Sequence, residues 1–324
     1  MQTRRFGRTD WQVSEIGYGM WGLGAWTGSE DDETRRSLDR AVELGCTFFD
    51  SAWSYGDGRS ERLLGELVAR HRGRPLLVAT KIPPKTKRSF ALPSDALADV
   101  FPPDHMREYT ARSLENLRVD AIDLLQFHIW SDHWADDPGW DDWKRTIAAL
   151  KREGKVRAFG ISVRRWQPAN ALRALETGLI DAVQVAYNLF DQSPEDELFP
   201  ACERLDVGVI ARTPFDEGSL TGALTPDSTW PDDDFRHGYF SQENLAATLP
   251  RVDAVRADLP EGMALPELAL RFILQQPAVS TVIPGMRKLR HVDRNLAVSD
   301  GLPLSPALRR ALRAHRWNRH PKVA

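Results

Sequence analysis

The sequence predicts one domain, residues 1–324, of the (β/α)8 TIM-barrel class, with a short N-terminal β-hairpin and an extra C-terminal helix. Apolar strand segments alternate with amphipathic helical segments eight times, and no change of composition separates them. Polar residues end several of these strands, as expected where parallel strands carry side chains to one rim. An open doubly wound sheet is the alternative, but the tight glycine-rich turn of a dinucleotide fingerprint does not follow the first strand.

The predicted elements follow the order of such a barrel. Residues 3–15 are expected to form the hairpin, because two strand-like runs flank a Gly7 to Asp10 turn. Strands are predicted at 15–20, 47–49, 76–80, 122–127, 156–161, 182–187, 207–210 and 279–283. Helices are predicted at 32–44, 61–70, 104–117, 141–152, 168–176, 197–205, 242–258, 265–275, 287–296 and 306–313. Two long loops are expected, at 82–103 and 215–240.

Composition argues against several classes of function. The net charge is -3 without a basic excess, so no nucleic-acid partner is expected. No apolar run is long enough to cross a membrane, and the N-terminal residues lack the apolar core of a signal peptide. Cys46 and Cys202 sit among apolar neighbours, which predicts buried thiols and a cytoplasmic location. The oligomeric state cannot be read from these features.

Four chemically capable residues follow three consecutive predicted strands. Asp50 ends the second strand and Tyr55 lies in the loop after it, while Lys81 and His128 end the next two strands. Singly, each has an ordinary interpretation as a turn, packing, surface or core residue. Together they predict a catalytic set, because a buried lysine and a buried aspartate each need a partner. We expect Lys81 to lower the Tyr55 pKa, making Tyr55 a general acid, and His128 to orient a substrate oxygen.

A metal site is the competing interpretation of the loop around His128. Histidine and acidic residues cluster there, at His128, Asp132, His133, Asp136 and Asp137. The spacing is a poor match to known ligand patterns, and the acids fall in a polar loop. The sequence therefore predicts no metal.

Over nearly its whole length the chain resembles the aldo-keto reductases. The segments that carry the resemblance are 45–66, 78–81, 123–128, 160–162 and 282–295. The resemblance implies a (β/α)8 barrel that binds an extended nicotinamide dinucleotide at its carboxyl-terminal rim. It also implies that hydride passes from the cofactor to a carbonyl carbon while Tyr55 gives the oxygen a proton.

The resemblance further implies which residues hold the cofactor. Ser162 and Gln184 match positions that bind the nicotinamide carboxamide. The loop after the seventh strand would pass the pyrophosphate, and the segment after the eighth would bind the adenosine end. The residues so assigned are Thr213, Pro214, Phe215, Gly218 and Leu220 in the loop, and Gly285, Arg287, His291 and Asn295 in the segment. Arg212, just before the loop, matches a position beside the nicotinamide ring.

Three positions depart from the family pattern. Val163 stands where the family often has an asparagine, and Arg294 where it often has a glutamate. Arg212 stands where an aromatic ring often stacks on the nicotinamide, although a guanidinium plane can also stack.

Basic residues after the eighth strand indicate NADP(H). Arg287, Lys288, Arg290 and His291 surround a predicted helix start, where they oppose the helix dipole unless an anion is bound. The 2′-phosphate of NADP(H) is that anion in our hypothesis, and a solvated basic face is the alternative.

The predicted function is the reduction of an aldehyde, ketone or keto-sugar to an alcohol, or the reverse reaction. Trp21, Trp53 and Trp130 flank strand ends and are expected to line the substrate pocket, with core packing as the alternative. A second hypothesis is a cofactor-binding regulatory subunit with little turnover, because such subunits keep the same four residues. A metal hydrolase on this barrel is disfavoured by the ligand pattern.

Overall fold

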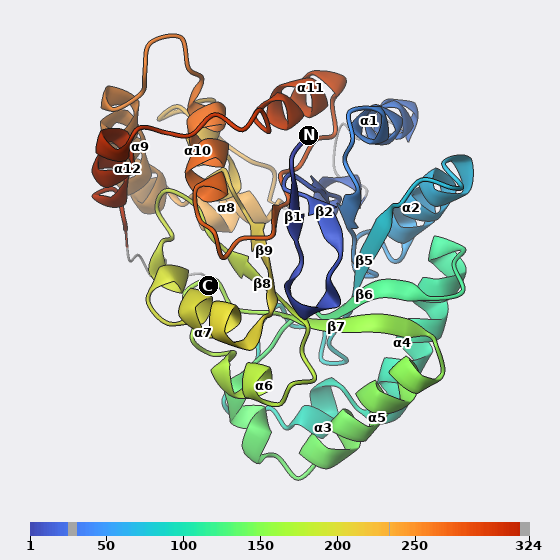
Figure 1. Cartoon of the computed structure of the whole chain (residues 1–324). Coiled ribbons are helices and arrows are strands. Elements are labelled where there is room, and N and C mark those ends of the chain that lie inside the picture. The colour runs from blue at the N-terminus through green and yellow to red at the C-terminus, as the bar shows by residue number, and fades with distance from the viewer. Residues whose placement is uncertain (25–30, 233, 318–324) are drawn as a thin grey trace.

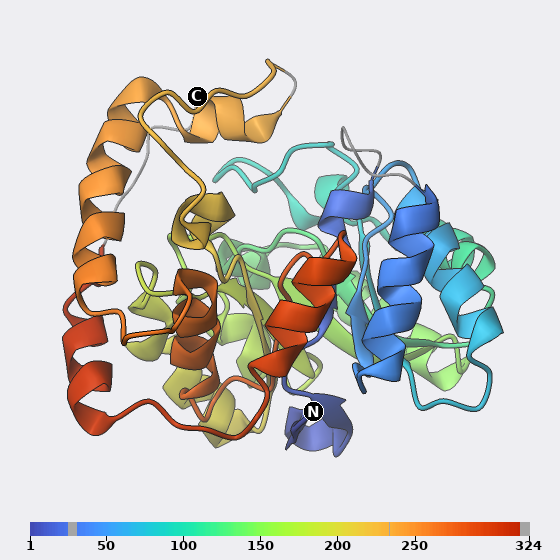
Figure 2. The same cartoon turned by 90° about the horizontal axis from the view of Figure 1, so that it is seen from above.

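The structure is a computed structural model that describes residues 1–24, 31–232 and 234–317. Within them, eight parallel strands form one sheet in the order β10-β9-β8-β7-β6-β5-β4-β3. Parallel bridges between Ile16 and Val282 and between Gly19 and Gly285 join the two ends of this sheet. The predicted (β/α)8 fold is therefore confirmed, with the helices around the strands (Figures 1 and 2).

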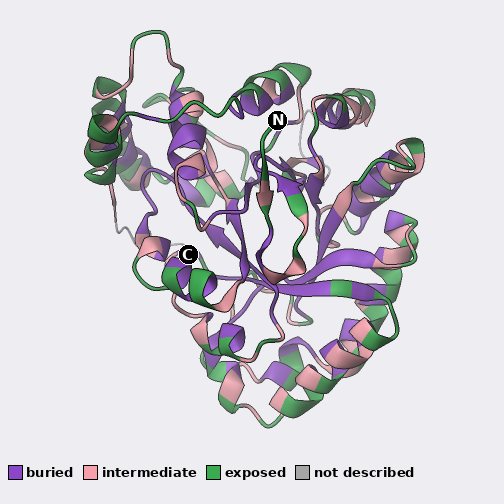
Figure 3. Cartoon of the chain, in the orientation of Figure 1, coloured by how far each residue is buried: buried purple, intermediate pink, exposed green. Residues whose placement is uncertain are grey.

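The barrel strands occupy the predicted places in the chain: the first, sixth and eighth are shorter than predicted, and the third, fifth and seventh are longer. They are β3 (Tyr18–Gly19), β4 (Phe48–Asp50), β5 (Leu77–Ile82), β6 (Ile122–Phe127), β7 (Val156–Ser162), β8 (Ala182–Ala186), β9 (Gly208–Arg212) and β10 (Thr281–Val282). They form the buried centre of the molecule (Figure 3).

The helices pack around the strands with their apolar faces inward. They are α1 (Asp31–Glu43), α2 (Arg59–Arg70), α3 (Leu97–Val100), α4 (Pro103–Leu117), α5 (Trp140–Arg152), α6 (Leu172–Glu176), α7 (Leu198–Leu205), α8 (Phe235–Tyr239), α9 (Gln242–Ala257), α10 (Leu265–Leu274), α11 (Leu289–Ala297) and α12 (Pro306–Arg313). Short 3-10 turns precede or follow several of them: η1 (Gly7–Thr9), η2 (Trp21–Leu23), η3 (Asp132–Asp136), η4 (Ser193–Glu195) and η5 (Asp216–Thr221). No helix of the described residues is long and apolar enough to cross a membrane.

The N-terminal hairpin closes the amino-terminal end of the barrel. Strands β1 (Thr3–Arg5) and β2 (Gln12–Ser14) pair antiparallel, as predicted. Phe6 is fully buried and packs with Phe48 and Leu124 in the apolar interior of the barrel. The hairpin thus seals one end, which leaves the carboxyl-terminal rim as the open end.

Glycine allows the close approach of the first and last strands. A Cβ on Gly19 would lie 2.5 Å from the carbonyl oxygen of Ile283, a distance that real Cβ atoms do not show. The amide of Gly19 donates to the carbonyl of Pro284 at 3.0 Å. The seam therefore depends on a position without a side chain.

One helix start and both long loops also differ from the prediction. Helix α6 begins at Leu172 rather than at Pro168, because Asp132 of the neighbouring loop accepts the backbone N–H groups of Arg173 and Ala174. A side chain from elsewhere in the sequence thus caps the helix. The expected loop 215–240 contains η5 and α8, and the expected loop 82–103 contains α3.

Candidate active site

The centre of the candidate site is an ion pair between β4 and β5. The Lys81 ammonium donates to Asp50 Oδ2 and to the Ser51 carbonyl oxygen, both at 2.6 Å. Lys81 is 0% exposed, and Asp50 is also buried. The two strands are paired in parallel, which brings their carboxyl ends together. A lysine without solvent stays charged only beside such a partner, and its pKa is in fact raised despite burial, chiefly by Asp50.

Two glutamines hold the other oxygen of Asp50. Gln126 on β6 and Gln184 on β8 donate to Oδ1 at 3.0 and 2.9 Å. The carboxylate is therefore bound on both sides and cannot rotate away from Lys81. Sequence reasoning missed Gln126, although its position two residues before His128 on the same strand is a period-2 signal for an inward-facing side chain.

Tyr55 lies next to this pair. Its hydroxyl oxygen is 3.4 Å from Lys81 Nζ, and the ammonium sits 5.0 Å from the ring centroid. The expectation of a lowered Tyr55 pKa is wrong in its net direction. Burial raises this pKa more than Lys81 lowers it, and Asp50 raises it further. Tyr55 is therefore held in its protonated form, which is the form that donates a proton.

His128 completes the group at the end of β6. Its ring packs edge-on against Tyr55 with the centroids 5.6 Å apart. Burial, Lys81 and Arg212 together lower the His128 pKa to about 3. The imidazole is thus neutral at physiological pH, with one nitrogen carrying a hydrogen and the other free to accept. The structure therefore gathers all four residues of the predicted set at one rim.

The predicted carboxamide residues lie side by side beneath the rim. Ser162 ends β7 and is the register partner of Gln184 on β8. One amino hydrogen of Gln184 is already given to Asp50. The predicted cofactor contact of Gln184 is thus joined to the Asp50–Lys81 pair through one side chain.

Charged residues gather in the loop after β9. Arg212 donates to the Val163 carbonyl at 3.1 Å, while its Nε and the Thr213 hydroxyl are buried without a hydrogen-bond partner among the described residues. Thr213 and Glu217 have positive φ angles of 54° and 56°. Polar atoms without partners in a strained loop are what a site for an absent polar ligand would present.

Arg165 fixes this loop and was not singled out by sequence reasoning. The buried guanidinium donates to Asp191 Oδ2 at 3.0 and 2.5 Å, to Asp216 Oδ1, and to Glu217 at 3.4 Å. Tyr239 of α8 also donates to Asp216, at 2.9 Å. The cation thus joins the loops after β7, β8 and β9. We call this set of five residues the Arg165 cluster.

The remaining predicted residues of the loop after β9 follow Thr213. Pro214 and Leu220 are buried, Phe215 is half-buried, and Gly218 has φ 115° with open space where a Cβ would lie. The chain here runs along the rim and leaves room beside its backbone at Gly218.

The segment after β10 also has open space at the predicted position. Nothing lies within 4 Å of a Cβ placed on Gly285, whereas the Arg287 side chain lies across Gly22 of η2. The helix begins later than predicted: α11 starts at Leu289, so Arg287 precedes its N-terminus. His291 and Asn295 lie one helical turn apart on α11, and Asn295 is buried.

The three predicted pocket tryptophans occupy different environments. Trp21 is 40% exposed and stacks edge-on with Phe235 of α8 at 4.9 Å. Trp53 is half-buried against Tyr109. Trp130 is only 2% exposed and donates to Asp132. Its environment favours the alternative interpretation of core packing.

Trp130 belongs to a set that we call the aromatic block. Its members lie within 6.3 Å of one another in successive ring pairs, and they are Phe101, Phe127, Trp130, Trp134, Trp140 and Trp143. The acids once considered as metal ligands are engaged elsewhere: Asp132 caps α6, and Asp136 pairs with Arg173. The described residues contain no group of three or more ligand-type side chains suited to a metal ion.

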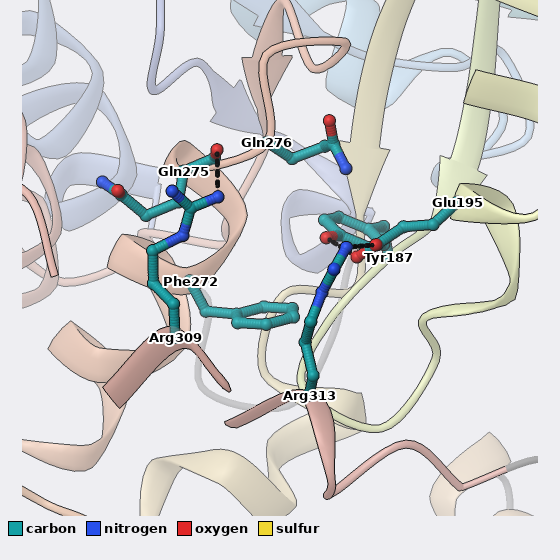
Figure 4. Close-up of a pocket in the computed structure, with 7 residues that line it drawn as sticks. All are labelled: Tyr187, Glu195, Phe272, Gln275, Gln276, Arg309 and Arg313. Atoms are coloured by element: carbon teal, nitrogen blue, oxygen red, sulfur yellow. Dashed lines mark hydrogen bonds and ion pairs between the residues drawn. The ribbon is translucent and has the colours of Figure 1, made fainter. Parts of the chain in front are cut away.

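A small cavity lies beside α10 and α12 (Figure 4). It measures about 30 Å³ and is lined by Tyr187, Glu195, Phe272, Gln275, Gln276, Arg309 and Arg313. Tyr187 donates to Glu195 at 2.6 Å, and Arg313 pairs with the same carboxylate. The volume suits about one water molecule, so this cavity is not a substrate site.

The sequence model of the Aldo/keto reductase family matches residues 15–316, so the chain belongs to this family. The solved structure of aldo-keto reductase AKR11C1 from Bacillus halodurans, in its holo form, has a TM-score of 0.77 and 26% identity. The similarity covers 98% of this chain and 97% of that one.

Two curated relatives carry names with different cofactors. The NADH-specific methylglyoxal reductase of Escherichia coli is 28% identical over 307 residues, 90% of this chain and 91% of the relative. The aldo-keto reductase yakc [NADP(+)] of Schizosaccharomyces pombe is 29% identical over 305 residues, 90% of this chain and 85% of the relative. Membership of the family therefore leaves the choice between the two dinucleotides open.

Proposed function

We propose that the chain is an NADP(H)-dependent oxidoreductase that reduces the carbonyl group of an aldehyde, ketone or keto-sugar to an alcohol, or catalyses the reverse reaction. One observation carries the proposal: a buried ammonium, fixed on Asp50, is 3.4 Å from the hydroxyl oxygen of Tyr55 at the open end of the barrel. A buried ion pair beside a tyrosine hydroxyl at the open end of a barrel is an arrangement typical of a functional site.

In this proposal Tyr55 gives its proton to the carbonyl oxygen. Burial keeps the hydroxyl protonated until a partner arrives. As the proton leaves, negative charge grows on the phenol oxygen, and the Lys81 ammonium stabilises it. Asp50 keeps Lys81 charged and in place. Neutral His128 donates a hydrogen bond to the same substrate oxygen and orients the carbonyl.

The residues of the rim fit a nicotinamide dinucleotide. The open backbone at Gly218 and Gly285 leaves room for close approach, and the buried Arg212 Nε and Thr213 hydroxyl lack partners among the described residues. When bound, the dinucleotide supplies the hydride for the carbonyl carbon. Ser162 and Gln184 are proposed to hold its carboxamide, and Arg212 to stack on its ring.

We assign the adenosine end to the segment after β10 and propose NADP(H) over NAD(H). The half-buried Arg287 side chain lies across Gly22. His291 has a lowered pKa because of partial burial and the neighbouring cations, which marks a locally positive surface. A 2′-phosphate would neutralise that surface. The buried free thiols Cys46 and Cys202 also fit the reducing environment of the cytoplasm.

The test is a panel of aldehydes, ketones and keto-sugars with NADPH and NADH, run on the wild type and on Tyr55→Phe. The variant should retain cofactor binding and lose about 10²–10⁴-fold in kcat, since it lacks the general acid. Tyr187→Phe is the matched control, because the hydroxyl of this tyrosine donates to Glu195 at the small cavity and is not one of the four residues. Near wild-type turnover by Tyr55→Phe would mean that the assignment of the four residues is wrong.

A regulatory subunit that binds the dinucleotide remains the second candidate. It predicts cofactor binding by the wild type with turnover absent across the whole panel. The panel therefore separates the two candidates without further variants.

A further inference from the structure

His128 has a neighbour that the proposed mechanism does not use. Ser54 Oγ lies 3.1 Å from Nδ1 of the His128 ring. The other ring nitrogen, Nε2, has no hydrogen-bond partner among the described residues. Nδ1 of the imidazole is thus in contact with the protein, and Nε2 is left for a ligand.

The Ser54 hydroxyl is positioned by its loop. The amide of Tyr55 donates to the Ala52 carbonyl at 3.1 Å, and the amide of Gly58 donates to the Trp53 carbonyl at 2.7 Å, so Ser54 lies within two overlapping turns. The same loop is attached to β5, because the amide of Trp53 donates to the Lys81 carbonyl at 3.4 Å.

The backbone of His128 is attached to the same strand end. Its amide donates to the Ile82 carbonyl at 3.1 Å, one residue beyond Lys81. The end of β5 therefore aligns the loop that carries Ser54 with the loop that carries His128. Although 74 residues separate the two in sequence, their contact follows from fixed backbone on both sides.

We propose that Ser54 is a positioning residue that fixes the ring of His128 and its tautomer by donating its hydroxyl hydrogen to Nδ1. With Nδ1 accepting, the single hydrogen of the neutral ring is on Nε2. Nε2–H is then a donor that points away from Ser54 and can reach a substrate carbonyl oxygen. If Ser54 accepted instead, Nε2 would be a lone-pair acceptor and would repel that oxygen.

The neutral state of His128 supports this assignment. Because its pKa is lowered to about 3, the ring does not become a double donor at any pH where the protein would be assayed. A protonated ring carries a hydrogen on both nitrogens and therefore has no alternative tautomer. A neutral ring beside a hydroxyl has two arrangements, and only one serves a carbonyl substrate.

The inference rests on the proposed function, since it assigns His128 a carbonyl oxygen to bind. It can nevertheless fail separately. Tyr55→Phe tests the function through turnover, whereas the state of the His128 ring is visible in the protein without substrate.

The experiment is ¹⁵N NMR of the imidazole groups in the wild type, Ser54→Ala and Ser54→Thr. The His128 signals are identified by their loss in His128→Asn. We expect wild-type Nε2 to carry the hydrogen and Nδ1 to resonate as a hydrogen-bonded acceptor. Ser54→Ala should move Nδ1 towards the position of an acceptor without a partner, and Ser54→Thr, which keeps the hydroxyl, should restore it.

Kinetics on a substrate found in the panel give the second readout. Ser54→Ala should lower kcat about threefold to tenfold, the range set by one neutral hydrogen bond, with KM and the cofactor Kd nearly unchanged. Ser54→Thr should recover most of kcat. The split between kcat and KM is expected because His128 binds the oxygen most strongly as charge develops on it.

A matched serine–histidine pair elsewhere provides the control. Ser131 Oγ lies 2.7 Å from Nδ1 of His133, and His133 Nε2 contacts the carbonyl of Asp95 outside the group of four. Ser131→Ala should shift the His133 signals and leave kcat unchanged. A hydrogen on Nδ1 of wild-type His128 would overturn the proposal, as would a Ser54→Ala variant with the wild-type Nδ1 signal and wild-type kcat.

Discussion

Two buried cations lie at the rim of this barrel, and they differ in the number of carboxylates around them. Lys81 has one carboxylate, Asp50, and one carbonyl as close acceptors. Arg165 has three carboxylates around it: those of Asp191, Asp216 and Glu217. Both cations are shielded from water, so burial alone does not distinguish a reactive group from a structural one.

The two cations differ in the acceptor that their longest hydrogen-bond contact reaches. After its two short contacts, Lys81 still points a hydrogen towards the Tyr55 oxygen, at 3.4 Å, which is longer than an optimal hydrogen bond. Arg165 donates to carboxylates of two loops, and its own 3.4 Å contact is with a third carboxylate, Glu217, rather than with a hydroxyl. A buried cation can stabilise a transition state only if one of its N–H groups can still strengthen its hydrogen bond as negative charge develops on the acceptor. A cation whose N–H groups already face carboxylates has no such group left.

Removing the reactive cation should have the largest effect. Lys81→Met is expected to lower kcat by about 10²-fold or more, because charge on the departing tyrosine oxygen is no longer stabilised. The Tyr55 pKa, already raised by burial, should rise further without Lys81. Reduction requires protonated Tyr55 and fails as pH rises through this pKa, so its alkaline limit should move to higher pH.

Oxidation of the alcohol gives the complementary profile for Lys81→Met. This direction requires the phenolate, so its rate should begin to rise only at higher pH than in the wild type. The measurement is the pH–rate profile in both reaction directions, with circular dichroism to verify that the variant is folded. An unchanged profile at an unchanged rate would reduce Lys81 to a structural lysine.

Removing Arg165, whose hydrogen bonds go to carboxylates, should lower the stability of the fold instead. Arg165→Leu leaves three buried or half-buried carboxylates without their common partner, and we expect a loss of about 3–5 kcal/mol in the free energy of unfolding. Arg164→Ala is the matched control: this neighbour is exposed and lies over the Phe90 ring, so its loss should be about 1 kcal/mol or less. Denaturant unfolding of both variants provides the comparison. Equal losses of unfolding free energy would contradict the proposal that Arg165 holds the three loops together.

The smallest effect concerns Arg287, a half-buried cation that precedes α11. Arg287→Ala should weaken NADPH binding by about tenfold and leave NADH binding nearly unchanged, since one charge-assisted contact of about 1.5 kcal/mol is lost. Titration of both cofactors by tryptophan fluorescence quenching measures it. Arg294→Ala, on the exposed face of α11, is the control. A similar loss for both cofactors would show that Arg287 does not read the 2′-phosphate.

The sequence was sufficient for the parts of the site that depend on strand order. Asp50, Lys81 and His128 follow strands that are consecutive in the chain and adjacent in the sheet, so parallel pairing alone brings them together. The hairpin and the barrel class follow from period and turn residues in the same way. These features are local in sequence or fixed by topology.

The parts that could not be predicted depend on loops and on competing energies. The Arg165 cluster joins three loops whose contacts are not encoded by any spacing, and the start of α6 depends on Asp132, some 40 residues away in the neighbouring loop. The net Tyr55 pKa required a comparison of burial with the Lys81 charge, and sequence gives the sign of each effect but not their sizes. The contact of Ser54 with His128 needed the side-chain geometry.

The aromatic block has a consequence for spectroscopy. Trp140 and Trp143 stack with their centroids 4.8 Å apart and their planes 11° from parallel, and Trp130 lies 5.0 Å from Trp143. Indoles this close share their excited states, so their transitions should couple as excitons and dominate the near-ultraviolet circular dichroism spectrum. That band would report the packing of the β6–α5 connection alone, an optical signal that is separate from the quenching of tryptophans at the rim such as Trp21.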